Sequence, residues 1–347
     1  MPPEPPPAAL RLVVDSEAIA ANWRALDRLS GEASAGAAVK ADAYGTGVAK
    51  ALPALVAVGA RDFFVAHWSE VAAVLKHTAP ASVSVLHGPL TRSDADYAIA
   101  TGVKPVINSL QQARLWQDAG GGLCDLMIDT GINRLGLPMG ELGHEAITAL
   151  DVDILMSHLA SADEDVPQNA QQLALWQDAR GQVAQRRASL ANSAGICLGP
   201  QYHGDLTRPG LSLYGGIPRP ELEDQIVQVA RPQAAIMQVR EIGEGEAVGY
   251  NATFRAEGPM RIGAVAIGYA DGYLRCWSGL GSASDKGLHL PVLGRVSMDM
   301  TILDLTAAPA LKEGDWVEID YPLPSASAKS GLSQYELLTL LGTRFAR

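Results

Sequence analysis

Residues 36–47 read G-A-A-V-K-A-D-A-Y-G-T-G, a short apolar run that ends in one lysine and is followed by a turn with two glycines and one tyrosine. The apolar run predicts a buried strand with Lys40 at its carboxyl end. Burial disfavours the ammonium form of a lysine and lowers its pKa. A neutral amine is a nucleophile that can form a Schiff base with an aldehyde. A lysine at a strand end can equally extend its amine into solvent, so Lys40 alone does not decide between these interpretations.

Similar apolar runs recur along the first two thirds of the chain. They occupy residues 37–39, 63–66, 83–86, 105–107, 126–128 and 154–156. Segments with helical spacing separate them, and this alternation predicts parallel βα units. About eight units would close into a (β/α)₈ barrel of the TIM type. An open doubly wound sheet is the alternative, which the lack of a G-x-G-x-x-G motif opening a helix makes less favoured.

The pattern changes near Arg231 and Pro232. Later apolar runs are short and bounded by turns, at residues 235–237, 262–267, 290–293, 300–303 and 316–319. They predict a mostly-β second domain, with one late helix after the capping box of Ser333 and Glu336. We therefore expect a disordered Pro-rich tail at 1–9, an α/β barrel at 10–232 whose first strand could pair with the β domain, and a C-terminal β domain at 233–347.

Composition excludes several classes of function. The net charge of -11 argues against nonspecific binding to nucleic acids or membrane surfaces. The three cysteines, Cys124, Cys197 and Cys276, have no metal-binding spacing, so no metal site is predicted and reduced thiols in a cytoplasmic protein are expected. The N-terminus lacks the basic and apolar regions of a signal peptide, and no apolar run is long enough for a membrane span.

The carboxyl ends of the predicted strands carry polar groups, and these ends meet at one face of a βα barrel. Each group alone has an ordinary explanation, such as a helix cap, a core histidine or a surface ion pair. Together they offer an amine for an imine, hydroxyl and backbone N–H groups for a phosphate, and two arginines for a planar anionic ligand. That combination describes pyridoxal 5′-phosphate. The groups are Lys40, Tyr44, Arg134, His158, Ser193, Arg208, Gly210 and Leu211.

Seven stretches in this order resemble the alanine racemases, which are fold-type III pyridoxal-phosphate enzymes. They are A-V-K-A-D-A-Y-G-T-G (38–47), I-D-T-G-I-N-R-L-G (128–136), S-H-L-A-S-A-D-E (157–164), L-A-N-S-A-G (190–195), D-L-T-R-P-G-L-S-L-Y-G (205–215), G-Y-A-D-G-Y (268–273) and G-R-V-S-M-D-M-T (294–301). The first, fifth and sixth are the most specific. The resemblance spans nearly the whole chain, and it implies the barrel, the β domain and a head-to-tail homodimer with shared active sites.

The resemblance also implies a role for each matching residue. Lys40 matches the lysine that bonds the cofactor, and Tyr269 matches a second acid/base contributed by the partner subunit. Arg208 matches the arginine that faces the pyridine nitrogen, where it makes the ring a weaker electron sink than a carboxylate would. The remaining matches are phosphate contacts at Tyr44, Ser193, Gly210 and Leu211, a histidine beside the ring at His158, and substrate contacts at Arg134, Met298 and Asp299.

These roles imply two-base racemisation of L- and D-alanine, supplying D-alanine for peptidoglycan. A racemase of broader or serine-type specificity is an alternative, because a few pocket contacts of about 1–3 kcal/mol each decide side-chain discrimination. A non-catalytic pyridoxal-phosphate carrier is a remote alternative, since such single-domain proteins lack the β domain and its G-Y-A-D-G motif.

Three positions depart from the family pattern. Many members carry a carbamylated lysine two residues before the D-T-G aspartate, where this chain has Met127, and we hypothesise that a bound anion such as chloride orients Arg134 instead. Thr46 replaces a frequent histidine. The end of the chain, residues 343–347, lacks a tyrosine that some relatives place near the phosphate, which suggests weaker cofactor retention.

Overall fold

The computed structural model describes residues 6 and 8–346, and they form two compact units. One unit is Ser16–Val227. The other joins the described residues through Asp15 to those from Gln228 onward, so the units divide at 227/228 where the sequence suggested 232/233. Strand β1 (Leu10–Val14) belongs to the second unit because it pairs antiparallel with β12 (Ala230–Ile242). The tail predicted for residues 1–9 lies mostly outside the described residues.

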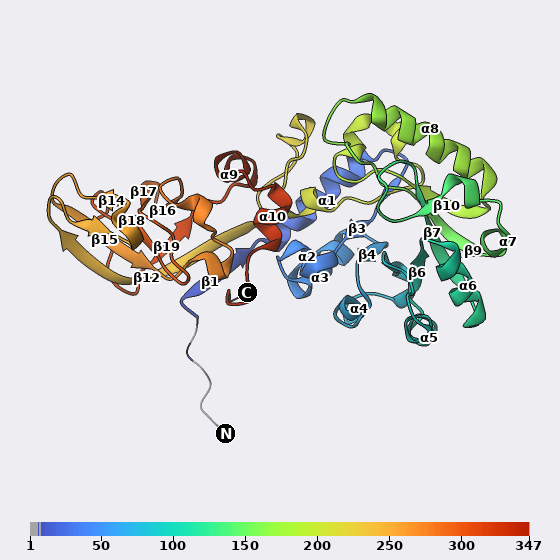
Figure 1. Ribbon diagram of the computed structural model, residues 1–347, viewed down its shortest axis with the longest axis horizontal. Helices are drawn as coiled ribbons and strands as arrows, with labels where there is room; N and C mark the ends of the chain where they lie inside the picture. The colour runs from blue at the N-terminus through green and yellow to red at the C-terminus, as the bar shows by residue number, and fades with distance from the viewer. Residues whose placement is uncertain (1–5, 7, 347) are drawn as a thin grey trace, which may run out of the picture. The chain divides into compact units, whose positions relative to one another are not determined.

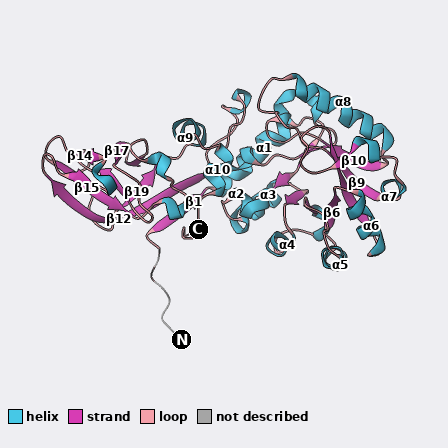
Figure 2. Ribbon diagram, in the orientation of Figure 1, coloured by secondary structure: helices cyan, strands magenta, loops and turns pink. Residues whose placement is uncertain are grey.

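The first unit is built on parallel strands with helices outside them (Figures 1 and 2). Hydrogen-bonded neighbours follow the order β3-β4-β5-β6-β7-β9-β10, and β8 pairs with β7. The strands are β2 (Ser34–Ala35), β3 (Ala37–Ala38), β4 (Phe63–Val65), β5 (Val83–Val85), β6 (Lys104–Ile107), β7 (Leu123–Asp129), β8 (Leu137–Pro138), β9 (Asp151–Met156), β10 (Gln185–Ser189) and β11 (Leu206–Thr207).

Strand β11 closes this sheet into a barrel. It pairs in parallel with β2, and the N–H of Ala38 donates to the carbonyl of Pro209 at 2.9 Å. On its other side the N–H of Arg208 donates to the carbonyl of Ala191, just past β10, at 2.8 Å. A ring without free edges confirms the expected (β/α)₈ barrel and excludes the open doubly wound sheet.

The helices of this unit are α1 (Ser16–Leu29), α2 (Lys40–Tyr44), α3 (Val48–Val58), α4 (Trp68–Val74), α5 (Arg92–Thr101), α6 (Leu110–Asp118), α7 (Glu145–Thr148) and α8 (Pro167–Gln182). The starts of α5 and α6 follow local capping rules. Ser109 accepts a hydrogen bond from the backbone of Gln112 at the start of α6, as the sequence predicts. Asp94 accepts from the backbone N–H of Leu90 and Thr91 at the start of α5.

The second unit is mostly β, as expected. Its strands follow the order β1-β12-β15-β18-β17-β16-β19, and β12 also pairs with β19, so the sheet from β12 to β19 closes on itself. Besides β1 and β12 it contains β13 (Ala247–Val248), β14 (Phe254–Arg255), β15 (Met260–Val265), β16 (Ser282–Asp285), β17 (Leu288–Leu293), β18 (Thr301–Asp304), β19 (Trp316–Ile319), α9 (Leu323–Ser330) and α10 (Gln334–Thr339).

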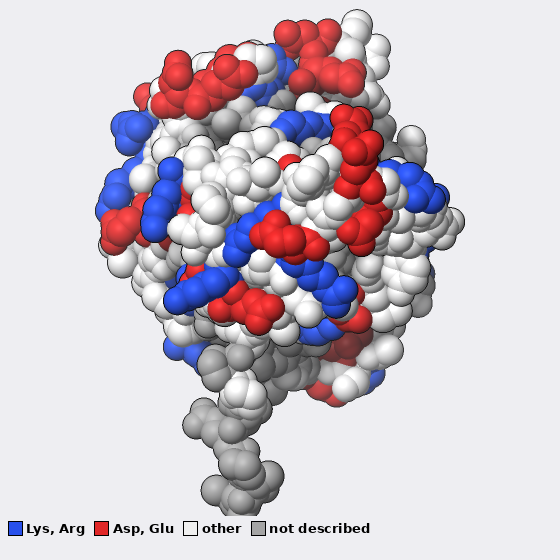
Figure 3. Space-filling view, turned by 90° about the vertical axis from the view of Figure 1, so that its left-hand side faces the viewer, with Lys and Arg blue, Asp and Glu red and all other residues white. Residues whose placement is uncertain are grey.

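The predicted capping box is present at α10, where Ser333 and Glu336 exchange hydrogen bonds between side chain and backbone. Acidic and basic side chains both occur over the face shown in Figure 3, and acidic ones predominate toward its upper edge. Among the described residues no helix has the length and apolar character needed to cross a membrane.

Candidate active site

Lys40 opens a turn with unusual backbone geometry. The sequence suggested an ordinary glycine-rich turn, but the four residues after Lys40, none of them glycine, have φ between +52° and +55°. This is a left-handed helical turn, α2, and each such residue costs about 1–2 kcal/mol relative to right-handed backbone. Strain of this kind persists only where surrounding contacts hold it, and it concentrates at functional sites.

Hydrogen bonds at both ends hold this left-handed turn. Glu70, in α4, accepts one from the N–H of Ala41. The same carboxylate accepts from the N–H groups of Ala66 at 2.7 Å and His67 at 2.9 Å. At the other end Asp42 accepts from the N–H of Val48 at 2.8 Å. Glu70 therefore ties the Lys40 turn to the start of α4.

The Lys40 amine has an environment suited to a nucleophile. Burial lowers its pKa, and the charges of Arg134 and Arg208 lower it further, while Glu70 acts in the opposite direction. The direction of this pKa shift is the one that the sequence predicts for a buried lysine.

A cluster of donors lies close to the Lys40 turn. Ser193 accepts hydrogen bonds from the N–H groups of Gly210 at 3.0 Å and Ser212 at 3.2 Å. A Cβ at Gly210 would lie only 2.2 Å from the Tyr44 hydroxyl oxygen, so glycine is required there. The hydroxyl of Ser212 is buried and has no hydrogen-bond partner among the residues that the structure describes. A buried donor without an acceptor fits a site built for an oxyanion such as phosphate.

The same cluster contains an aromatic pair. The rings of Tyr44 and Tyr214 stack with centroids 5.0 Å apart. The hydroxyl of Tyr214 donates to the carbonyl of Ala38 in β3 at 2.9 Å. Leu211 begins the short 3₁₀ helix Leu211–Tyr214 directly after Gly210. The predicted phosphate contacts Tyr44, Ser193, Gly210 and Leu211 are thus gathered at one place.

Arg208 is buried, and its guanidinium donates to the hydroxyl of Ser189 and the carbonyl of Ser157. It makes no ion pair with any carboxylate of the described residues. Arg208 is therefore not a surface ion-pair partner, which was the alternative explanation for this residue. Burial lowers the pKa of Arg208 to about 10, and the carboxylate of Asp125 acts in the opposite direction.

His158 interacts electrostatically with Arg134, Arg208 and Lys40. Burial lowers the pKa of His158 to about 3, and the charges of Arg208, Arg134 and Lys40 add to this effect. Arg134 is exposed, and no hydrogen bond or ion pair fixes its guanidinium within residues 8–346. Met127, at the position of the carbamylated lysine, is buried in β7.

The remaining predicted site residues lie in the β unit and form a second cluster. The N–H groups of Tyr269 and Ala270 donate to the carbonyls of Ser297 and Met298, both at 3.0 Å. A Cβ at Gly268 would lie 2.4 Å from the same two carbonyl oxygens, so the glycine permits this close approach. The turn carrying Tyr269 is therefore fixed against the segment that carries Met298.

Arg344 links the same two segments through side chains. Its guanidinium forms ion pairs of 2.7 Å with Asp271, which is buried, and with Asp299. The other oxygen of Asp271 accepts from the N–H of Gly268 at 3.0 Å. Asp299, predicted as a substrate neighbour, thus contacts Arg344 from the end of the chain.

Sequence reasoning missed three residues in these clusters: Glu70, Ser212 and Arg344. Glu70 could have been noticed as an acid at the third position of a helix, where it caps the helix start. Its bond to Ala41 and the pairing of Arg344 with two aspartates depend on contacts between distant segments. No local pattern signals them.

Comparison with known proteins identifies the family. Residues 14–218 match the alanine racemase N-terminal domain and residues 229–347 match the alanine racemase C-terminal domain. The chain belongs to the alanine racemase family. An alanine racemase of Methylobacterium nodulans is 41% identical over 97% of this chain and 95% of its own length. The biosynthetic alanine racemase of Agrobacterium fabrum is 38% identical over 98% of this chain and 93% of its own length.

Solved alanine racemases have the same fold. The Bartonella henselae enzyme, described with covalently bound pyridoxal phosphate, superimposes with a TM-score of 0.89 at 33% identity, covering 98% of this chain and 99% of the other. The biosynthetic alanine racemase of Pseudomonas aeruginosa gives a TM-score of 0.87 at 33% identity and covers 99% of both chains. Family membership therefore rests on sequence and on structure along the full length.

Proposed function

We propose that this chain interconverts L-alanine and D-alanine with pyridoxal 5′-phosphate, using Lys40 and Tyr269 as the two bases. The observation that carries the proposal is the desolvated amine of Lys40 beside a donor cluster in which the Ser212 hydroxyl has no acceptor within residues 8–346. Family membership supports the reaction, and the bound cofactor of the Bartonella henselae relative supports the cofactor.

The residues present fit this cofactor. Ser193, Gly210, Leu211 and Tyr44 would hold the phosphate, and the hydroxyl of Ser212 would gain an acceptor nearby. Lys40 would hold the aldehyde carbon through its amine. When bound, the cofactor withdraws electrons from the substrate's α-carbon, which makes the α-proton acidic.

The chain's own contribution is to move one proton at each face of that carbon. Burial lowers the pKa of Lys40, which increases the fraction of neutral amine that can accept a proton. The phenol of Tyr269 serves the opposite face, and two bases on opposite sides invert the stereocentre where a single base could not easily reach both. Following the family pattern, Lys40 serves the face that gives the D-enantiomer.

Arg208 decides how strongly the ring withdraws electrons. Its guanidinium is charged at neutral pH and has no proton acceptor site. It can therefore only donate to the pyridine nitrogen, which leaves that nitrogen unprotonated and the ring a moderate electron sink. This arrangement favours proton exchange over side reactions such as transamination.

We infer that Tyr269 acts on a partner subunit's site in a homodimer. Several large apolar side chains around the Tyr269 cluster are exposed in the single chain, among them Tyr250 at 65%, Met298 at 53% and Met300 at 46%. A second copy that covered them would remove this apolar surface from water. The dimer also follows the pattern implied by the family resemblance.

Two further points complete the proposal. An anion such as chloride beside Arg134 would replace the charge that Met127 cannot supply. His158 beside the ring is neutral at working pH because of its lowered pKa.

A cytoplasmic location and a supply of D-alanine to peptidoglycan are the expected physiological setting, although relatives of both biosynthetic and catabolic type are similar to this chain.

The test is incubation of the purified holoenzyme with L-alanine, and separately with L-serine, followed by chiral analysis. We expect D-alanine to form fastest. Faster conversion of serine would favour the broader-specificity alternative, and a bound cofactor without any racemisation would favour the carrier. In Tyr269→Phe, exchange of the L-substrate's α-proton should stop while the borohydride-reducible link at Lys40 persists. Full activity in this variant would remove Tyr269 from its role.

A further inference from the structure

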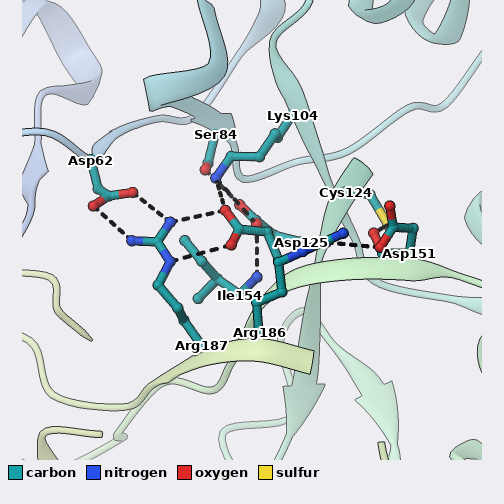
Figure 4. A network of polar contacts seen from close by, with 10 residues as sticks. Asp62, Ser84, Lys104, Cys124, Asp125, Asp151, Ile154, Arg186 and Arg187 are labelled. Carbon is teal, nitrogen blue, oxygen red and sulfur yellow. Dashed lines mark hydrogen bonds and ion pairs between the residues drawn. The ribbon is translucent and has the colours of Figure 1, made fainter. Parts of the chain in front are cut away.

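Arg275, in the β unit, differs from the paired cations of the barrel interior. There Arg187 forms ion pairs with Asp62 and Asp153 (Figure 4). Arg275 makes no ion pair with a carboxylate among the residues that the structure describes, and the group beside its guanidinium is an aromatic ring. Its Cζ lies over the ring of Tyr269, 5.3 Å from the centroid. A guanidinium at this distance is attracted by the π electrons of the ring.

The backbone that carries Arg275 is fixed to the turn that carries Tyr269. Arg275 begins a 3₁₀ helix that ends at Trp277. Trp277 is buried and stacks on the buried ring of Tyr273, with centroids 5.3 Å apart. The N–H of Tyr273 donates to the carbonyl of Gly268 at 3.2 Å. The guanidinium and the phenol ring therefore extend from one connected piece of backbone.

A cavity of about 340 Å³ opens beside the Tyr269 ring, and its lining includes Arg275 and Arg295. No aspartate or glutamate of the described residues lines it, so the charge of the two arginines is not neutralised there. Arg275 lies over the ring, whereas the structure gives no such contact for Arg295 within residues 8–346. Tyr250 and Met298 also line the cavity, and both belong to the exposed apolar surface that the proposed dimer would cover.

We propose that Arg275 is a positioning residue for Tyr269, which holds the phenol ring and stabilises the negative charge of its phenolate. The inference rests on the proposed function, in which Tyr269 takes the α-proton of the L-substrate. In that step the C–H bond breaks, its electron pair stays with the substrate carbon, and the proton forms the O–H bond of Tyr269. The phenol oxygen can accept this proton only after it has given up its own.

The physical reason is a difference between the two charge states of the ring. The negative charge of a phenolate spreads from the oxygen into the ring, so a cation over the ring attracts the phenolate more strongly than the neutral phenol. The guanidinium of Arg275 is always charged and cannot act as a proton acceptor. It therefore stabilises the form of Tyr269 that takes the proton, without competing for the proton itself.

The size of the effect follows from the type of contact. A cation over an aromatic ring contributes more when water is excluded than when the contact is exposed. Arg275 is exposed in the single chain and would be covered in the proposed dimer. Removing its charge should lower kcat/KM by between about fivefold, for an exposed contact, and about thirtyfold, for a covered one.

The measurement is the deuterium isotope effect on kcat/KM of the holoenzyme, taken with α-deuterated L-alanine and separately with α-deuterated D-alanine. In the proposed mechanism Tyr269 removes the label from the L-substrate and Lys40 removes it from the D-substrate. Arg275→Gln should slow only the Tyr269 step, so the ratio of the L to the D isotope effect should rise above its wild-type value. A general distortion would slow both steps and leave this ratio unmoved.

Two further variants serve as controls. Arg275→Lys keeps a cation near the ring and should retain most of the wild-type kcat/KM and ratio. Arg295→Gln is the matched control, because it removes a charge from the same cavity but not from the ring, and it should leave the ratio in place. The cofactor absorption of each variant is measured first, so that lost cofactor is not counted as lost activity.

An unmoved ratio in soluble, cofactor-loaded Arg275→Gln would overturn the proposal, as would an equal rise in Arg295→Gln or in Arg275→Lys. If Arg275→Gln does not fold, Arg275→Met takes its place, since it also removes the charge and keeps a long side chain. An unmoved ratio in folded Arg275→Met would then overturn the proposal. Wild-type holoenzyme that does not racemise alanine, or a fully active Tyr269→Phe, would instead refute the proposed function.

Discussion

Replacing Glu70 by alanine tests whether the left-handed turn holds Lys40 in place. Glu70 and Asp94 occupy the same position in two helices, and each accepts two backbone N–H groups at its helix start. Only Glu70 accepts a third bond, from Ala41 in the strained turn. Asp94→Ala is therefore a matched control that removes the helix cap but does not affect the turn.

The magnitudes follow from counting these bonds. Loss of the helix cap costs about 1–2 kcal/mol in either variant. The bond from Ala41 to a charged carboxylate adds about 1.5 kcal/mol, the lower end of the range because the contact is exposed. The unfolding free energy should thus fall by about 3 kcal/mol in Glu70→Ala and by about 1–2 kcal/mol in Asp94→Ala.

Activity separates the two variants further. Without its anchor the turn can relax from positive φ, since each left-handed residue carries about 1–2 kcal/mol of strain. A misplacement of the Lys40 amine that costs about 1.4 kcal/mol in the transition state lowers kcat/KM about tenfold. Glu70 also acts to raise the pKa of Lys40, so its loss leaves more neutral amine. A slower rate therefore reports geometry and not protonation.

The assays are urea unfolding and racemisation of L-alanine at pH 8, with the cofactor content of each variant measured beforehand. We expect Asp94→Ala to keep nearly wild-type kcat/KM. Equal kcat/KM and equal stability in the two variants would refute the idea that Glu70 anchors the Lys40 turn.

Three other predictions follow from the same structure. Arg344→Met should lower kcat about tenfold, because it removes a charge-assisted bond that fixes the Tyr269 turn, while cofactor absorption stays unchanged. A wild-type kcat would show that the hydrogen bond between Gly268 and Asp271 is enough to hold this turn. The pKa of His158 is about 3 in the folded state and about 6.5 in the unfolded state, so the native state binds fewer protons. The free energy of unfolding should therefore fall as the pH drops below about 6.5. Urea unfolding at pH 7 and pH 5 should show a smaller loss of stability in His158→Gln than in wild type. The rate of racemisation should depend on the identity and concentration of small anions that bind beside Arg134. If removal of chloride leaves the rate unchanged, an anion does not replace the negative charge that Met127 lacks.

The sequence predicted elements well where a short-range signal exists. The apolar runs at 63–66 and 83–86 became β4 and β5, and the Ser109 and Ser333 caps lie at real helix starts. It gave no signal for β10, whose sequence Q-R-R-A-S has no apolar run because Arg187 points to carboxylates inside the barrel. Helix α9 was missed as well, since its first turn contains a proline and its body is serine-rich.

Sequence alone also placed the candidate chemistry. Periodicity located the strand ends, and motifs such as A-V-K-A-D-A-Y-G and G-Y-A-D-G singled out Lys40 and Tyr269. Such predictions are possible because a strand end, a turn and a cap are set by neighbours within a few residues. They extend to which residues gather at the barrel mouth, since parallel strands end at one face.

Only the tertiary structure decided how those residues are supported. The hydrogen bond from Ala41 to Glu70 and the bonds from the buried Arg208 to Ser189 and Ser157 join segments that lie far apart in the chain. Burial and charge pairing depend on which distant groups exclude water from one another, and the strength of each interaction depends on that exclusion. A linear pattern does not contain this information, because it arises only when the barrel closes.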